Sequence, residues 1–199
     1  LRPLVQFDES ANTAQLVREH LLMVSPSGLV SMAGGKWTSY RKMAEEAVDR
    51  AVANSGLQPS GPCRTLDLRL FGAEHFAPEI FLVLTKDYGI EADIAHHLQH
   101  AFGDQAMRVG RLAESGLGAR LHPAHPYIEA EVVHAARHEL AERVSDVLTR
   151  RFPLAILDNA AAQAAVPRAV ELMAGEHGWD DARRRQETEL AMERLRVSI

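Results

Sequence analysis

The residues with the clearest chemical potential are Gly34, Gly35 and Lys36, here named the Gly-Gly-Lys corner, followed by Trp37 and Thr38. Two glycines at the end of a strand let a ligand ring approach the backbone with no Cβ in the way. A helix that begins directly afterwards offers unpaired N–H groups and partial positive charge, which suit a ring carbonyl or an anion. Lys36 adds a full positive charge at the same place. The corner is therefore a candidate site for a polar ring or a phosphorylated ligand.

The same pattern has two other interpretations. A Gly-Gly-Lys sequence before a helix is also typical of a tight turn that carries a surface lysine, and the residues by themselves leave that alternative open. A P-loop is excluded, because that motif needs a glycine five residues before the Gly-Lys pair and Ser or Thr after the lysine. Val30 and Trp37 occupy those positions, so the corner encodes no nucleoside triphosphate site.

The elements that must position the corner can be read from the flanking residues. Residues 17–24 and 29–33 are short apolar runs on either side of a Ser-Pro-Ser-Gly turn, which predicts a β-hairpin that the two glycines then end. Residues 38–54 carry apolar side chains at three- and four-residue spacing and are predicted to form a helix. Thr38 or Ser39 is the expected N-cap, because a hydroxyl can accept a hydrogen bond from a free backbone N–H group.

A linker separates this region from the rest of the chain. Residues 58–64 are rich in proline and glycine, which disfavour regular structure. We therefore expect residues 1–57 to form one domain region and residues 65–199 to form a helical C-terminal domain. The fold class expected is mainly α.

The C-terminal region is predicted to be helical because its apolar residues recur at helical spacing between glycines and prolines. The expected helices are 78–88, 91–102, 104–115, 127–142, 144–151, 159–176 and 180–197.

Three details of these helices carry specific expectations. Ser145 and Asp146 would form the N-cap of the fifth helix, and Pro167 favours a late start for the sixth, near Val166. In the fourth helix one apolar stripe should face the core while three polar residues face water. The stripe consists of Ile128, Val132, Val133, Ala136 and Leu140, and the polar residues are Glu129, Arg137 and Glu139.

Composition excludes several classes of protein. The formal net charge of −5 argues against a nucleic-acid partner, which usually meets a basic face. A single cysteine, Cys63, cannot form an internal disulfide and indicates a reducing compartment. No apolar run reaches the roughly 18 residues of a membrane span, and no signal peptide is visible. Because the sequence starts at Leu1 rather than Met, we expect a piece of a longer protein.

Histidine pairs and a basic cluster are further candidate sites. With ten histidines, chance pairs at helical spacing are expected, and Glu142 stands where a zincin would need its second histidine. We therefore predict no metal site and expect the histidines to be exposed or to cap helices. Residues 183–185 are arginines that can pair with the following glutamates on a solvated helix face, with contact to anionic lipid as the alternative. The histidine pairs are His96 and His100, His122 and His125, and His134 and His138.

Several segments together resemble one enzyme family. The run from Gly34 to Arg41, with Ala44 beyond it, resembles the signature near the end of the flavin domain of FAD-dependent glycerol-3-phosphate dehydrogenases. Residues 1–4 resemble that family's Gly-(Val/Leu)-Arg-Pro-Leu segment, and residues 127–151 resemble its helical C-terminal domain more loosely. The likeness covers nearly the whole chain. It implies that the hairpin and first helix are a remnant of a Rossmann-like α/β domain that binds FAD.

The resemblance also implies an activity and roles for residues. Family members oxidise sn-glycerol 3-phosphate to dihydroxyacetone phosphate and pass a hydride to FAD, and the electrons go to quinone, or to oxygen in the oxidase branch. By similarity, Arg2 would bind the substrate phosphate and Lys36 would lie near both flavin and substrate. Gly34, Gly35, Trp37 and Thr38 would meet the isoalloxazine ring mainly through backbone. The family's substrate base has no match in the chain, so no catalytic residue is assigned.

The chain by itself is expected to be inactive. The Gly-x-Gly-x-x-Gly turn that holds the FAD pyrophosphate is absent from its residues, so we expect neither tight FAD binding nor turnover. For the parent enzyme, the resemblance implies a cytoplasmic protein at the inner membrane surface and leaves a homodimer open. The alternative from another class is a non-catalytic helical interaction module in which the corner is incidental.

Overall fold

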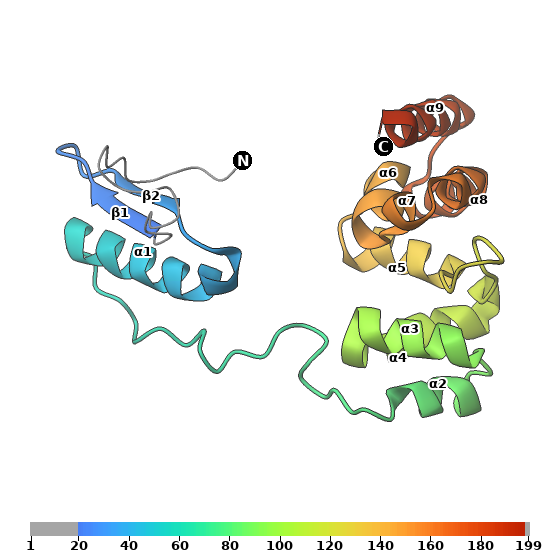
Figure 1. Cartoon of the computed structure of the whole chain (residues 1–199), viewed down its shortest axis with the longest axis horizontal. Helices are drawn as coiled ribbons and strands as arrows, with labels where there is room; N and C mark the ends of the chain where they lie inside the picture. Colours follow the sequence, from blue (N-terminus) through green and yellow to red (C-terminus); the bar gives the residue numbers. More distant parts are fainter. Residues whose placement is uncertain (1–19, 198–199) are drawn as a thin grey trace, which may run out of the picture. The chain divides into compact units, whose positions relative to one another are not determined.

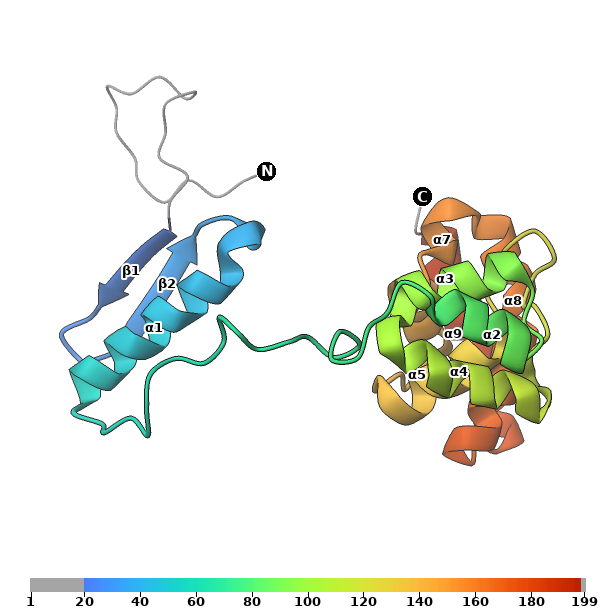
Figure 2. The same ribbon diagram turned by 90° about the horizontal axis from the view of Figure 1, so that it is seen from below.

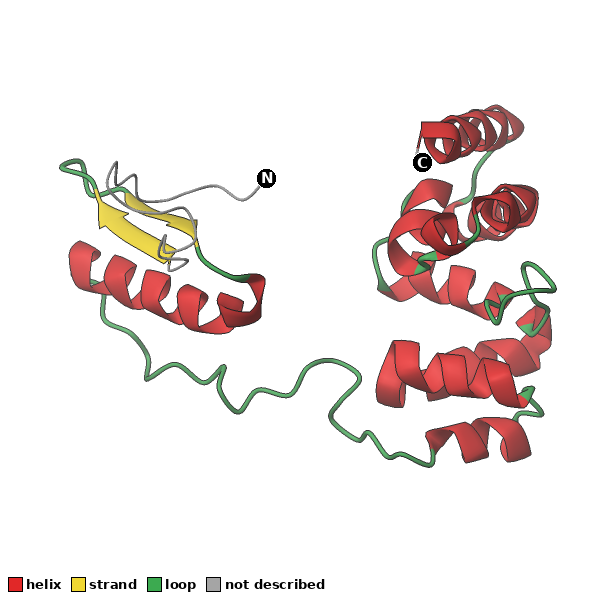
Figure 3. Ribbon diagram, in the orientation of Figure 1, coloured by secondary structure: helices red, strands yellow, loops and turns green. Residues whose placement is uncertain are grey.

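A computed structural model describes residues 20–197, and the chain divides between Leu68 and Arg69 into two compact units. The described part of the first unit contains a two-stranded sheet and one long helix, whereas that of the second unit is built from helices (Figure 3). The mainly α fold class with a preceding hairpin and helix is thus confirmed. None of the helices described is both long and apolar enough to span a membrane.

The hairpin of the first unit joins β1, His20–Val24, to β2, Val30–Gly34, in antiparallel pairing. The register runs from Val24 opposite Val30 at the turn to His20 opposite Gly34 at the open end. The turn is closed by Ser25, whose backbone N–H donates to the carbonyl of Leu29 at 2.9 Å. The hairpin predicted from the two apolar runs is therefore confirmed.

The helix of the first unit is α1, Tyr40–Ser55, and the 3-10 turn η1, Trp37–Ser39, leads directly into it. The helix lies along one face of the hairpin (Figure 1) and keeps that position in the perpendicular view (Figure 2). The predicted hydroxyl cap is wrong. Ser39 occupies the N-cap position, but its hydroxyl donates to the carbonyl of Lys36 at 3.0 Å and accepts nothing from the helix. The 3-10 turn has already used the backbone groups, since the Tyr40 N–H donates to the Trp37 carbonyl.

The first unit has little interior of its own. No residue of α1 is buried, and large apolar side chains around it are mostly exposed, with Trp37 at 86%, Leu29 at 65% and Val48 at 61%. Soluble proteins seldom expose so many large apolar side chains on so small a unit, and such surface normally contacts further protein. The described residues alone therefore do not complete the core of this unit.

The second unit is a stack of helices that runs from α2 to α9 (Figure 1). Each helix expected from the sequence has a counterpart, two of them continued or interrupted by 3-10 or π turns, and the short α7 was not predicted. The elements are α2 Ile80–Asp87, α3 Ala92–Phe102, η2 Gly103–Gln105, α4 Ala106–Leu112, η3 Ala113–Leu117, α5 Glu129–His138, α6 Val144–Asp146, η4 Val147–Arg151, α7 Leu154–Leu157, α8 Asn159–His177 and α9 Asp181–Val197.

Helix α5 lies at the centre of this stack and contributes to two apolar clusters. Ala130 packs with the cluster of α2 to α4, while Val132 and Val133 pack with the cluster of α6 to α9. Just before α5, the ring of Tyr127 stacks on Phe152 with centroids 5.0 Å apart. The helix is buried on all sides over its first two turns, which is typical of the central helix of a domain rather than of a surface helix.

The predicted stripe is confirmed at Ile128, Val132 and Val133, which are buried, but it is wrong at its far end, and so is the predicted boundary of α5. Glu129, expected to face water, is buried, and Leu140, expected in the core, is 86% exposed. The helix ends at His138 and not near residue 142, because Leu140 adopts the left-handed conformation with φ 55°. The backbone N–H of Ala141 then donates to the carbonyl of Ala135 at 3.2 Å, which closes the helix end.

Two other expectations about helix starts are also wrong. Helix α8 begins at Asn159, and Pro167 lies inside it rather than at its first turn. The Asp158 side chain caps this early start by accepting from the N–H of Ala161 at 3.0 Å, and the buried alanines before Pro167 favour continuing the helix. In α6 the N-cap position is Arg143, and Asp146 caps from inside the helix by accepting the Arg143 N–H at 3.0 Å.

Candidate functional site

The Gly-Gly-Lys corner lies where β2 ends and η1 begins. Gly34 and Gly35 have φ angles of 76° and 83°, a left-handed conformation that favours glycine. Lys36 returns to extended backbone, with φ −115° and ψ 141°, at the N-cap position of η1. The order predicted from the sequence, a strand, the corner and then a helix, is thus confirmed. All three residues of the corner are exposed among the residues described.

Gly35 is also required by the packing beneath the corner. A Cβ built on Gly35 would lie 2.7 Å from the Sδ and Cε atoms of Met43 on α1 and 3.1 Å from the Cβ of His20 on β1. The Met43 thioether end can turn aside, but the His20 Cβ is fixed to the strand. The glycine therefore lets the corner sit directly between strand and helix, a reason distinct from the ligand approach that the sequence suggested.

Lys36 is the cation of the corner that has no counter-ion in the part of the chain described. Among residues 20–197 its ammonium group makes neither an ion pair nor a hydrogen bond. The two cations that follow on α1 are both paired: Arg41 Nη1 lies 3.2 Å from Glu45 Oε2, and Lys42 Nζ lies 3.3 Å from the same oxygen. The hydrogen bond from Lys42 is the main cause that lowers the pKa of Glu45. The available positive charge is thus at Lys36.

Trp37 and Thr38 supply the rest of the predicted surface. Both side chains are exposed, and the Trp37 ring stacks on Tyr40 with centroids 5.5 Å apart. The first backbone bond of the turn is donated by Ser39, so the N–H groups of Trp37 and Thr38 have no partner within the helix. The structure brings Gly34 to Thr38 together as one continuous exposed surface. Arg2, the predicted phosphate ligand, lies outside the described residues.

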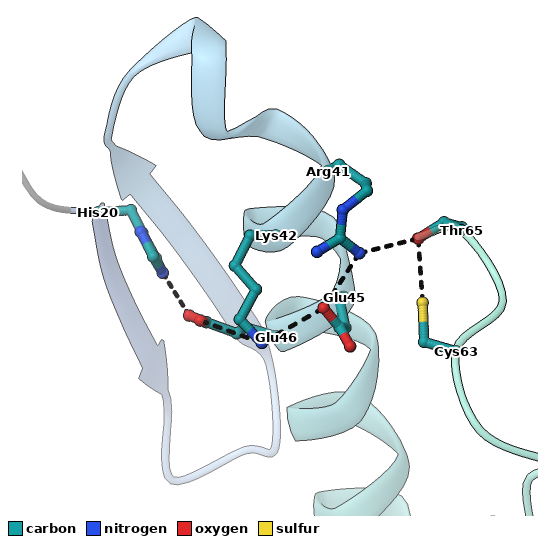
Figure 4. A network of polar contacts seen from close by, with 7 residues as sticks. All are labelled: His20, Arg41, Lys42, Glu45, Glu46, Cys63 and Thr65. Atoms are coloured by element: carbon teal, nitrogen blue, oxygen red, sulfur yellow. Dashed lines mark hydrogen bonds and ion pairs between the residues drawn. The ribbon is translucent and has the colours of Figure 1, made fainter. Parts of the chain in front are cut away.

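A network of polar side chains fixes the helix below the corner (Figure 4). His20 Nε2 lies 2.5 Å from Glu46 Oε2, which connects β1 to α1. Arg41 also donates to Thr65 Oγ1 at 3.2 Å, and the Cys63 thiol lies 3.0 Å from the same hydroxyl. Helical spacing could have predicted the pair of Arg41 and Glu45. Nothing in the sequence indicated the contact between His20 and Glu46, which are far apart along the chain.

The environment of His134 differs from the exposed or capping position expected for the histidines. His134 is 1% exposed, and both of its ring nitrogens lack a hydrogen-bond partner in the part of the chain described. Burial, with a smaller effect of His138, lowers the pKa of His134 to about 4. The expectation of exposed or capping histidines is therefore wrong for His134. No group of three or more His, Cys, Asp or Glu residues within the described chain could hold a metal ion.

The acid–base pairs expected on α9 are found in part. Arg183 Nη2 lies 2.7 Å from Glu187 Oε1, as the four-residue spacing predicted. Glu187 is nevertheless buried, and its other oxygen accepts from the N–H of Val144 at 3.4 Å, so this part of the helix faces α6 rather than water. In the apolar segment 152–157, Phe152 and Leu154 are buried, while Ile156 is 79% exposed.

Comparisons with known proteins agree on one family. Residues 63–184 match the family model described as the C-terminal domain of alpha-glycerophosphate oxidase. The chain is 40% identical to a mitochondrial glycerol-3-phosphate dehydrogenase of Arabidopsis thaliana over 98% of its length and 33% of the relative's. It is 42% identical to the human mitochondrial glycerol-3-phosphate dehydrogenase over 96% of its length and 27% of the relative's. The chain therefore spans about a third or less of these relatives.

A solved structure supports the fold. The glycerol-3-phosphate dehydrogenase of Bacillus halodurans, solved as a complex with FAD, matches 88% of this chain and 36% of its own with a TM-score of 0.72. The sequence identity is 23%, so this likeness concerns the fold alone.

Proposed function

Because the chain belongs to the family of the C-terminal domain of alpha-glycerophosphate oxidase, we propose that it is the C-terminal part of an FAD-dependent glycerol-3-phosphate dehydrogenase. The parent enzyme oxidises sn-glycerol 3-phosphate to dihydroxyacetone phosphate. When bound, FAD supplies the hydride acceptor, which no amino-acid side chain can provide. The residues of this chain then hold and orient the reactants.

The observation that carries this proposal is the exposed corner with its free cation. Gly34 and Gly35 turn with positive φ, and Lys36 has no counter-ion among the residues described. The N–H groups of Trp37 and Thr38 point out of the first turn without helix partners. This set consists of hydrogen-bond donors and one cation, which fits the electron-rich carbonyl edge of a flavin ring. An ordinary surface turn would have no need of all of them.

The roles of single residues follow from their chemistry. The Lys36 ammonium favours negative charge on the ring edge or on substrate oxygens held beside it, and such preorganised charge stabilises a transition state in which that charge develops. Gly34, Gly35, Trp37 and Thr38 contribute backbone groups. Arg2 is the proposed ligand of the substrate phosphate, because a guanidinium group can bond a dianion through two N–H groups at once.

The remaining features of the parent enzyme are also proposed. Electrons pass from the flavin to quinone, with oxygen as the acceptor in the alternative oxidase branch. The enzyme is cytoplasmic and touches the inner membrane peripherally, and a homodimer is compatible with its exposed apolar residues such as Ile156. The chain alone neither binds FAD tightly nor turns over, because its residues contain no Gly-x-Gly-x-x-Gly turn to hold the FAD pyrophosphate.

The test uses the full-length parent enzyme and an artificial electron acceptor. Lys36→Ala and Arg2→Ala should each lower turnover of glycerol 3-phosphate at least tenfold, while the visible spectrum shows that FAD is retained. Lys42→Ala is the matched control, because Lys42 lies on α1 just beyond the corner and is already paired with Glu45 and Glu46. It should leave turnover unchanged.

The outcomes separate the proposal from the helical-module alternative. A parent protein that is yellow, active and sensitive to Lys36→Ala supports the enzyme. A colourless parent that ignores glycerol 3-phosphate supports a non-catalytic helical module and overturns the proposed function. Equal losses in Lys36→Ala and Lys42→Ala would overturn the role given to the corner while leaving the family in place.

A further inference from the structure

Two side-chain hydrogen bonds tie the hairpin to α1, one at each end. At the open end, His20 Nε2 lies 2.5 Å from Glu46 Oε2 (Figure 4). At the turn end, Asn54 Nδ2 donates to the carbonyl of Gly28 at 3.2 Å. The two contacts join the same strand pair to the same helix. They differ in their distance from the Gly-Gly-Lys corner along the hairpin, because Gly28 is in the turn and His20 is opposite Gly34.

His20 touches the corner as well as the helix. It is the cross-strand partner of Gly34, and its Cβ lies 3.1 Å from the position that a Cβ on Gly35 would take. The side chains of His20 and Glu46 are 22% and 36% exposed, so the bond between them is partly shielded from water. A shielded hydrogen bond to a charged group holds its partners more firmly than an exposed one.

The other charged side chains near Glu46 do not connect it to β1, whereas His20 does. Lys42 Nζ approaches Glu46 Oε1 at 3.8 Å, but Lys42 belongs to the same helix and also contacts Glu45. Arg41 is held by Glu45 and Thr65, away from the strand. In the described part of the chain, the hydrogen bond between His20 and Glu46 is thus the side-chain bond that fixes the position of β1 relative to α1 beside the corner.

We propose that His20 is a positioning residue for the flavin site, acting through the Gly-Gly-Lys corner. Its bond to Glu46 holds the end of β1 against α1, and the backbone of Gly35, packed between His20 and Met43, then sets where Lys36 lies. This inference rests on the proposed function, since the positioned cation acts on FAD. Loss of the bond should displace Lys36 without removing it from the protein.

The experiment compares variants in the full-length, FAD-loaded parent enzyme. His20→Ala removes the bond, His20→Gln keeps a donor, and Glu46→Gln keeps an acceptor. Asn54→Ala is the matched control, because it removes the other hairpin-to-helix bond far from the corner. The measurements are the redox potential of the bound FAD, its visible absorption spectrum, kcat and KM with an artificial acceptor, and the melting temperature.

The inference predicts a specific pattern. His20→Ala should shift the flavin potential in the same direction as Lys36→Ala and lower kcat about tenfold with little change in KM. His20→Gln and Glu46→Gln should keep most of the parent enzyme's kcat. Asn54→Ala should lower the melting temperature about as much as His20→Ala does, but it should not shift the flavin potential.

Other results overturn the inference. If His20→Ala and Asn54→Ala change potential and kcat alike, His20 has only a structural role. If His20→Ala leaves the potential unchanged while Lys36→Ala shifts it, the corner is positioned by something else and the proposed function still stands. A parent enzyme without flavin or turnover would overturn both the proposed function and this inference.

Discussion

Arg168 on α8 donates two hydrogen bonds to the buried carboxylate of Glu129, from Nε at 2.7 Å and from Nη2 at 2.8 Å. Arg137 makes the same bidentate contact with the carboxylate of Glu176, from Nε at 2.6 Å and from Nη2 at 2.7 Å. The two arginines are equally exposed, at 46% and 47%, but the carboxylates are not: Glu129 is 9% exposed and Glu176 is 21% exposed. The two contacts therefore share one geometry but differ in how much water reaches the acid, and Arg168 also donates from Nη1 to the exposed Glu171 on its own helix at 2.7 Å.

The first prediction follows from this difference. Arg168→Ala should lower the free energy of unfolding by about 2 kcal/mol, because it leaves a carboxylate buried without its partner. Arg137→Ala should cost less than about 1 kcal/mol, since water can solvate Glu176 once the arginine is gone. Urea unfolding of the chain, followed by far-ultraviolet circular dichroism, measures both. Equal costs would show that burial of Glu129 does not set the strength of its ion pair.

A second prediction concerns the end of α5. Leu140 has φ 55° and an 86% exposed side chain, so it carries the strain of the left-handed conformation without an apolar contact that compensates for it. Leu140→Gly should raise the free energy of unfolding by about 1 kcal/mol, because glycine adopts this conformation without strain. Leu140→Ala is the control, since alanine keeps the Cβ that causes the strain, and it should give no such gain. A thermal unfolding experiment in which both variants behave alike would contradict this explanation.

The third prediction is a dependence of stability on pH. The pKa of His134 is lowered to about 4, chiefly by burial, from 6.5 in the unfolded chain. Between pH 4 and pH 6.5 the folded state therefore binds fewer protons than the unfolded state. The contribution of neutral His134 to the free energy of unfolding is complete above pH 6.5 and is lost as the pH falls to about 4. At about 1.4 kcal/mol per pH unit, the loss amounts to about 3 kcal/mol.

His134→Leu should abolish this part of the acid destabilisation, as measured by urea unfolding at a series of pH values. His138→Gln is the control, because His138 is exposed and only adds to the shift at His134 together with Arg108. The carboxylate of Glu139, 3.9 Å from His134 Nε2, is the acid that faces the ring. Acids whose pKa is lowered in the folded state, such as Asp158, also lower the free energy of unfolding as the pH falls to their unfolded pKa of 3.8 and below. The effect of His134 is therefore measured as the difference in the free energy of unfolding between the variant and the unchanged chain. If His134→Leu keeps the full slope, the titrating group lies elsewhere.

The sequence predicted those features that depend on neighbours along the chain. The hairpin and its open end at Gly34 follow from two short apolar runs, the turn between them and the two glycines, and the pairing of Arg183 with Glu187 follows from helical spacing. The features that were missed depend on contacts between distant segments. Burial of Glu129 could not be foreseen without knowing that Arg168 would face it, and Pro167 was expected to begin a helix that core packing in fact starts at Asn159.

The candidate site divides in the same way. Its consecutive residues from Gly34 to Thr38 were predicted because one local motif contains them all. The contact between His20 and Glu46 was not, because it arises only when α1 folds back along β1. Gly35 shows both causes: its positive φ is local, whereas its contact with Met43 requires the folded unit.

The last prediction separates the effect of backbone strain from the effect of steric contacts at two glycines in and beside the hairpin. Gly28 and Gly35 have nearly equal φ angles of 86° and 83°, so an alanine at either should cost about 1–2 kcal/mol of backbone strain. At Gly28 the nearest atom to a new Cβ is Asn54 Nδ2 at 3.4 Å, an ordinary contact, whereas at Gly35 it meets Met43 and His20. In the full-length parent enzyme, Gly35→Ala should therefore displace the corner and weaken FAD binding at least tenfold, while Gly28→Ala keeps its flavin. Flavin titration of the two deflavinated variants measures this, and equal affinities would mean that the packing of Gly35 against His20 and Met43 does not determine the geometry of the site.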